Sequence, residues 1–160
     1  GFRPYRQVLY PKKMLKDGGF PSSVRAHAMG GRAAIYGAGS AVERYFRKQS
    51  QGRYQIVSRP ELDGFETLPG ASFALAALTP VMFTYKGGGP AEEPQVMGQH
   101  GHLPDTVPTG WVMTGPGIEA GSDRGRCEVI GVAPTLAHWL GLTLPQAEGT
   151  DRLAPTWFTR

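Results

Sequence analysis

The sequence predicts an α/β protein made of short strands and helices. Apolar runs of strand length alternate with segments of helical periodicity along the chain. In addition, 23 glycines and 14 prolines divide its 160 residues into short pieces. Hydrophobic residues make up 40% of the chain, a globular composition, and this length can bury one ordinary core or two small ones.

The first 30 residues are expected to form one segment of a core and a connection. Residues 7–10 have the composition of a short strand. A short helix is expected to begin at Pro11, since proline suits the first helical position, and to stop at Gly18 and Gly19. Residues 20–31 are rich in small and turn-forming types and are interpreted as the connection.

Residues 31–90 are predicted to form a small α+β unit that begins with a strand and a helix. The strand is expected over residues 32–36. Ser40 and Glu43 have the spacing of a capping box, so a helix is expected to follow. It would place Val42, Tyr45 and Phe46 on one apolar face.

The same unit is predicted to continue with three strands. Residues 54–59 alternate in character and end at Pro60, as a strand would. The apolar runs 71–78 and 81–85 are separated by Thr79 and Pro80, which predicts a hairpin.

Residues 91–160 are expected to belong to the core again. A short apolar strand is predicted over residues 110–114, and a helix over residues 132–140 that ends at Gly141. The tail from residue 149 onward is expected to dock on the core through its aromatic side chains.

Charge and composition exclude several classes of function. The net charge of +4 arises from 17 Lys and Arg against 13 Asp and Glu, and the basic residues are scattered rather than clustered in the stripe that nucleic acids require. No apolar segment has the length of a membrane span. A single cysteine, Cys127, excludes an intrachain disulfide, and the sequence assigns no compartment.

Two common catalytic motifs are also absent. The glycine-rich residues 86–94 lack the Lys-Ser/Thr ending of a phosphate-binding loop. No segment has the GxSxG pattern of a nucleophile elbow. Thr135 follows Pro134 at a predicted helix start, where local hydrogen bonding explains it more simply than nucleophilic chemistry.

The most informative segment is GQHGHLPD at residues 98–105, where a histidine lies between glycines in a loop. It is followed by GPGI at residues 115–118 and by VAPTLAHWLG at residues 132–141. In this order, the three motifs resemble the C-terminal part of the alkaline phosphatase superfamily, and most closely its type I phosphodiesterase/nucleotide pyrophosphatase group. The resemblance is strongest over residues 98–149 and weaker, but in order, over residues 1–97.

The resemblance implies roles for the histidines. His100 would be a ligand of one of two active-site zinc ions, which in this family lie roughly 4 Å apart. In an extended loop, His102 would point the same way and could supply a second ligand or a substrate contact. Asp105 would hold the loop or accept an imidazole N–H. His27 and His138 are interpreted as structural.

The resemblance also implies that residues are missing. Family members place a nucleophilic Thr or Ser, an Asp-x-x-x-His pair and an Asp-His-Gly motif before this region, and this chain has none of them. Gly1 and Phe2 look like the end of the last motif. The chain is therefore expected to be an inactive fragment, comprising an alkaline phosphatase-like core segment (1–30), a cap unit (31–90) and the C-terminal part of the core (91–160).

The implied activity of the intact enzyme is hydrolysis of a small-molecule phosphate ester or diester. The cap would shape the leaving-group pocket, with Tyr85, Phe83 and Arg59 as candidates. A phosphonate or sulfate ester is the alternative substrate, because those reactions reuse the same metal centre. The alternative from another class is a non-catalytic α+β binding module. The expected partners are the missing N-terminal half or another copy of the chain.

Overall fold

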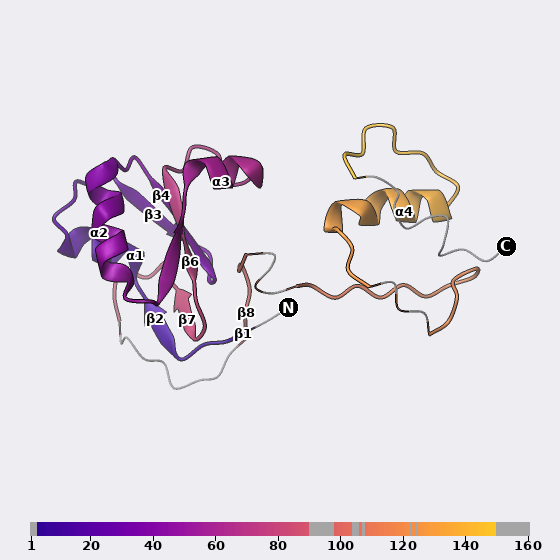
Figure 1. Ribbon diagram of the computed structural model, residues 1–160, viewed down its shortest axis with the longest axis horizontal. Coiled ribbons are helices and arrows are strands. Elements are labelled where there is room, and N and C mark those ends of the chain that lie inside the picture. The colour runs from indigo at the N-terminus through magenta and orange to yellow at the C-terminus, as the bar shows by residue number, and fades with distance from the viewer. Residues whose placement is uncertain are drawn as a thin grey trace. The chain divides into compact units, whose positions relative to one another are not determined.

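The computed structural model describes residues 3–89, 98–103, 106, 108–121, 123 and 125–149 (Figure 1). The chain divides into two compact units, residues 1–110 and residues 111–160. The described part is a mixed α/β structure, as the sequence predicts.

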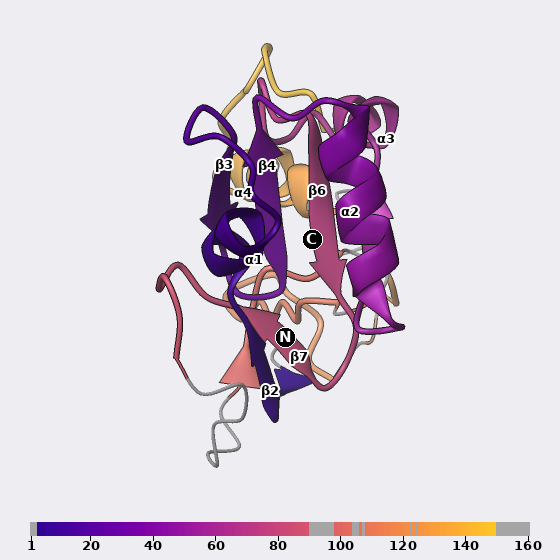
Figure 2. The ribbon, with the colours of Figure 1, turned by 90° about the vertical axis from the view of Figure 1, so that its left-hand side faces the viewer.

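A four-stranded antiparallel sheet forms the centre of the first unit. Its strand order is β3-β4-β6-β5, so β4 and β6 are central and β3 and β5 are edges. Figure 2 shows β3, β4 and β6 side by side. The strands are β3 (Arg25–Ala28), β4 (Arg32–Tyr36), β5 (Tyr54–Val57) and β6 (Phe73–Ala77).

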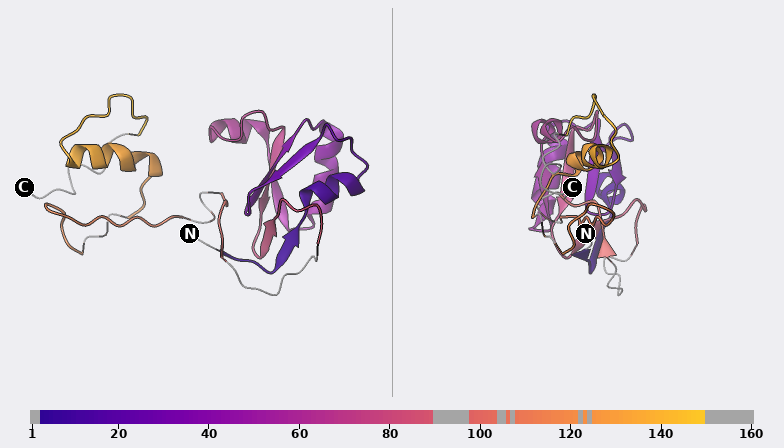
Figure 3. Two further views of the ribbon diagram at one scale, coloured as in Figure 1. Left: turned by 180° about the vertical axis from the view of Figure 1, so that it is seen from behind. Right: turned by 90° about the vertical axis from the view of Figure 1, so that its right-hand side faces the viewer.

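Helices cover both faces of this sheet. Because side chains alternate across a strand, β4 and β6 present one apolar set to each face. Helices α1 (Pro11–Asp17) and α2 (Ser40–Ser50) pack on one face, through Leu15, Val42 and Phe46 (Figure 2). The short helix α3 (Arg59–Gly64) packs on the other through Leu62 (Figure 3). The predicted apolar face of α2 is confirmed.

Two small sheets join the start of the chain to later residues. Strand β2 (Gln7–Leu9) pairs in parallel with β7 (Val81–Phe83). Strand β1 (Arg3–Pro4) pairs antiparallel with β8 (Gly98–Gln99). The second pairing positions the loop that contains His100.

The predicted hairpin of residues 71–78 and 81–85 is wrong. Strand β6 has β4 on one side and β5 on the other, so no edge of β6 is left for β7. The chain instead turns after β6, and β7 pairs with β2. The two apolar runs therefore serve different sheets.

The connection expected over residues 20–31 contains a strand, β3. It pairs with β4 in the register Arg25 to Tyr36 and Ala28 to Ala33. Val24 and Ala26 are buried on the core side, whereas Arg25 and His27 are exposed. The four-stranded sheet therefore begins with β3, before residue 31.

The capping box lies in α3 and not in α2. Gly39 is the N-cap of α2, and Glu43 pairs with Arg47 at 2.6 Å instead of returning to the helix start. In α3, the Glu61 carboxylate accepts hydrogen bonds from the Ser58 hydroxyl at 2.6 Å and from the Ser58 N–H at 2.7 Å. These two bonds, the hydroxyl bond first, hold the pKa of Glu61 below its ordinary value.

The substitution Glu61→Gln is expected to lower thermal stability at pH 7. Since folding lowers the pKa of Glu61, its contribution is present above the ordinary pKa and is lost as the pH falls through the lower folded value. The Tm difference from the parent should therefore shrink below about pH 4. Thermal melts at pH 7 and pH 3 measure it, with the exposed Glu66→Gln as control. A difference independent of pH would contradict the assignment.

The second unit contains one described helix, α4 (Val132–Trp139), which a single 3₁₀ turn, η1 (Val129–Gly131), precedes. The helix is confirmed, but the strand expected over residues 110–114 is absent, because these described residues make no strand pairing. The tail that was expected to dock on the core, beyond residue 149, lies outside the described residues.

Candidate functional site

The loop that follows β8 is fixed by backbone contacts on both sides of His100. Before it, Gln99 pairs with Arg3. At His100 itself, the carbonyl oxygen accepts a hydrogen bond of 2.8 Å from the Gly31 N–H. Gly101 follows with a φ of +85°, and a Cβ at this position would collide with the carbonyl oxygen of Met29. The glycine is therefore required by close packing against the turn after β3.

The two histidines of the loop lie in different environments. His100 is exposed, whereas His102 is half-buried and both of its ring nitrogens are shielded from solvent. His102 packs over Gly31. A Cβ added at Gly31 would lie 2.7 Å from the backbone nitrogen of His102 and 2.8 Å from its Cγ. The sequence predicts that the two side chains point the same way only if the loop is extended. The positive φ of Gly101, between them, interrupts the extended backbone.

Leu103 completes the attachment of the loop to the first unit. Its side chain packs against the buried cluster under α3, which includes Ala34, Val57 and Leu62. The loop thus leaves β8, touches the turn after β3 and ends on the apolar core. His100 is exposed, whereas the three residues that follow it, Gly101, His102 and Leu103, are half-buried.

Asp105, for which the sequence predicts a supporting role, and the two histidines interpreted as structural come from different parts of the chain. Asp105 lies outside the described residues. His27 is exposed on β3, and His138 is exposed on α4 in the second unit. Among the residues that the structure describes, no group of three or more His, Cys, Asp or Glu side chains is arranged to hold a metal ion. Within the described residues, His100 is therefore not part of a preformed group of metal ligands.

Two of the three candidates for a leaving-group pocket serve the fold. Phe83 is 1% exposed and belongs to the main core. Arg59 donates to the carbonyl oxygens of three residues after α3, namely Thr67, Leu68 and Ala71, and pairs with Asp63 at 2.9 Å. It fixes the turn after α3. Tyr85 is 70% exposed and open to a ligand.

Buried hydroxyl groups also have structural partners. The Tyr54 hydroxyl donates to the Phe46 carbonyl oxygen at 2.7 Å, and burial raises the pKa of Tyr54 well above its ordinary range. Thr135 is fully buried and donates to the Gly131 carbonyl oxygen at 2.6 Å. The predicted local role of Thr135 is confirmed, and neither hydroxyl is presented as a nucleophile.

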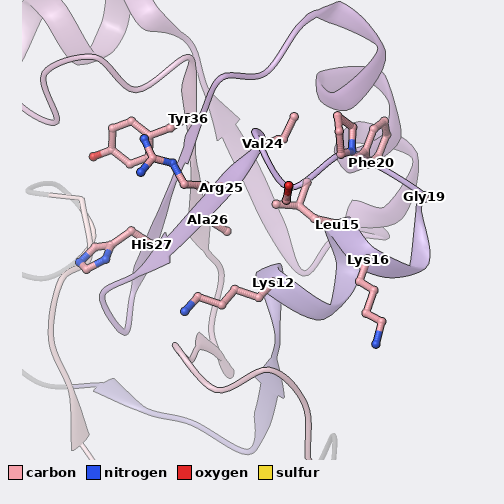
Figure 4. A pocket seen from close by; sticks show the side chains of 12 residues that line it. Lys12, Leu15, Lys16, Gly19, Phe20, Val24, Arg25, Ala26, His27 and Tyr36 are labelled. Atoms are coloured by element: carbon pink, nitrogen blue, oxygen red, sulfur yellow. The ribbon is translucent and has the colours of Figure 1, made fainter.

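A basic groove of about 910 Å³ runs along the outer edge of β3 (Figure 4). Four basic side chains surround it, two from α1 and two from β3, and none of its lining residues is acidic. Its lining residues are Lys12, Leu15, Lys16, Gly19, Phe20, Pro21, Ser22, Val24, Arg25, Ala26, His27 and Tyr36.

Sequence reasoning missed this groove because it assigned residues 20–31 to a connection. The signal was present in the alternation of Val24 and Ala26 with Arg25 and His27, which is typical of a strand with one buried face. Without that strand, Lys12 and Lys16 are only scattered charges. The fold brings them together with the basic residues of β3.

In the described part of the chain, no helix combines the length and apolar character needed to cross a membrane. Comparisons with protein-family models, with curated proteins and with solved structures find no match to this chain.

Proposed function

We propose that this chain is part of a metal-dependent phosphoric ester hydrolase that resembles the type I phosphodiesterase/nucleotide pyrophosphatase group of the alkaline phosphatase superfamily. The observation that carries the proposal is the exposed His100 at a loop whose backbone is fixed on both sides. The order of the three sequence motifs supports it.

The geometry of the loop suits a metal ligand. A ligand must be held close to its productive position by the surrounding structure. Here the β1–β8 pairing before His100, the Gly31 hydrogen bond at His100 and the packing of Leu103 after it restrain the backbone, while His100 is exposed. Neutral imidazole is a good zinc ligand.

One imidazole cannot hold zinc alone, because protein zinc sites have three or four protein ligands. The described residues form no group of three. The proposal therefore assigns the other ligands and the Thr or Ser nucleophile to a part of the protein outside this chain. When bound, two zinc ions would stabilise the attacking and leaving oxygens of an in-line displacement. The contribution of this chain is to position His100.

The arrangement of β1 and β8 is consistent with this division. The pairing places Arg3 opposite Gln99, the residue before His100. Strand β1, the first described element, therefore lies beside the start of the His100 loop. The expected partner is thus an N-terminal catalytic half, or another copy of the chain.

The proposed substrate is a small-molecule phosphate ester or diester. Phosphonate and sulfate esters are the alternatives, since they would use the same metal centre and differ only in the surrounding pocket. Tyr85 is the described residue of the cap that remains available to contact a leaving group.

The substitution His100→Ala, made in the longer protein that contains this chain, is expected to reduce bound zinc and to lower kcat/KM about 10- to 100-fold. The measurements are zinc content by mass spectrometry and hydrolysis of bis(p-nitrophenyl) phosphate, p-nitrophenyl phosphonate and p-nitrophenyl sulfate. His138→Ala, exposed on α4, is the matched control and should leave both readouts unchanged. Full zinc content and full activity in the His100 variant would refute the proposal.

A non-catalytic binding module is the second candidate function, and the basic groove is the observation that favours it. Such a module would need no metal. The two functions are compatible in one chain, because the groove shares no lining residue with the His100 loop.

A further inference from the structure

Strand β3 is an edge strand whose outer side is open along the basic groove. The sheet order places β4 on the inner side of β3. Within the described residues, no strand pairs with the outer side of β3. Just after β3, the Met29 N–H donates a hydrogen bond of 2.7 Å to the carbonyl oxygen of Arg32, at the start of β4. In an antiparallel ladder, residues that bond to the neighbour alternate with residues whose backbone groups point away. The backbone groups of Ala26 and Ala28 therefore point outward.

One face of this edge is basic. Arg25 and His27 are exposed and lie two residues apart on the same side of β3, and Tyr36 lies opposite Arg25 on β4 (Figure 4). Side chains two residues apart on a strand are roughly 6.6 Å apart. A strand added along β3 would present its own side chains at the same interval, directly opposite Arg25 and His27.

The other face of the edge is apolar with a basic rim. Leu15 and Phe20 line the groove on this side, and Lys12 and Lys16 extend from α1 beside them (Figure 4). In an added strand, every second side chain would lie on the face of Arg25 and His27. The side chains between them would lie on the other face, against Leu15 and Phe20. The groove therefore offers charge to one face of an extended segment and apolar contact to the other.

We propose that the edge of β3 binds an extended segment of a partner protein in which acidic residues alternate with apolar ones. Backbone hydrogen bonds to Ala26 and Ala28 would supply affinity, as in other cases of strand addition. The acidic side chains opposite Arg25 and His27 would supply specificity. This site does not depend on the hydrolase function proposed above.

The binding test uses the 160-residue chain and the blocked peptide Glu-Val-Glu-Val-Glu as the probe. Calorimetric titration measures affinity, and amide hydrogen exchange followed by NMR locates the contact. We expect binding that protects the amides of Ala26 and Ala28. A peptide with lysine in place of glutamate should not bind. Methylation of the peptide's backbone nitrogens should abolish binding, since it removes the donors that a strand needs.

The substitution Arg25→Glu is expected to weaken peptide binding about tenfold, because it places like charges opposite one another. Lys48→Glu makes the same charge change on the exposed side of α2, away from the groove, and should change the affinity less than about twofold. NMR spectra of both variants establish that each is folded.

Three results would overturn the proposal. Failure of the acidic peptide to bind would leave Arg25 and His27 with the role of discouraging self-association at a sheet edge. Equal binding of the methylated peptide would show attraction of charge without strand pairing. Equal loss of affinity in the Lys48 variant would show that net charge, rather than the groove, is responsible.

Discussion

Phe46→Ala is expected to lower the free energy of unfolding of the first unit by about 3–5 kcal/mol. Phe46 is completely buried between α2 and the sheet. Its ring meets those of Tyr45 and Phe73 edge to face, at centroid distances of 5.6 and 6.0 Å. Removing it leaves a cavity where the two elements meet. A loss of this size is a large share of the 5–15 kcal/mol that stabilises a typical domain.

Urea unfolding followed by circular dichroism measures this loss. The matched control is Phe65→Ala, which removes the same atoms from a side chain that is 52% exposed, and which should cost less than about 1 kcal/mol. Equal losses in the two variants would show that Phe46 is not a central core residue.

Gly101→Ala is expected to cost at least about 2 kcal/mol and to release the His100 loop from the first unit. Its φ of +85° disfavours any side chain, and an added Cβ would collide with the Met29 carbonyl oxygen. Because the clash is with backbone, a side-chain rotation cannot relieve it. The hydrogen bond from the Gly31 N–H to His100 should then open.

Hydrogen exchange at the Gly31 amide is the most direct measurement of this release. Gly52→Ala is the control, since Gly52 has a φ of +73° but has no atom within 4 Å of the Cβ position. It isolates the cost of the backbone conformation, about 1 kcal/mol. Unchanged exchange at Gly31 in the Gly101 variant would mean that the loop does not depend on this contact.

Elements specified by local pattern could be predicted from the sequence. Pro11 and the Gly18-Gly19 pair delimit α1, and the spacing of Val42, Tyr45 and Phe46 defines the buried face of α2. Strands β2, β4 and β5 follow from short apolar or alternating runs. In each case the information lies within about ten neighbouring residues.

Features that depend on distant residues could not be predicted in this way. The hairpin failed because the partner of residues 81–83 is Gln7–Leu9, at the other end of the unit. The capping box was misplaced because Ser40-Glu43 and Ser58-Glu61 have the same spacing. In the structure Gly39, and not Ser40, is the N-cap of α2, and Glu43 pairs with Arg47.

The candidate sites show the same division. A histidine between glycines correctly indicated an exposed side chain at residue 100. The structure also uses Gly101 to approach the Met29 carbonyl oxygen closely, a contact that the position of this glycine in the sequence does not predict. The basic groove requires knowledge that α1 packs beside β3, which no local pattern contains.

The pairing of β1 and β2 with β8 and β7 determines the order in which the unit can form during synthesis. Strands β3 to β6 lie within residues 25–77 and can pair as soon as that stretch leaves the ribosome. Strands β1 and β2 emerge first, but their partners follow only at residues 81–83 and 98–99. Within this unit, the residues that are translated first are therefore the last to be paired, and its slowest contacts are those of β1 and β2 with β8 and β7.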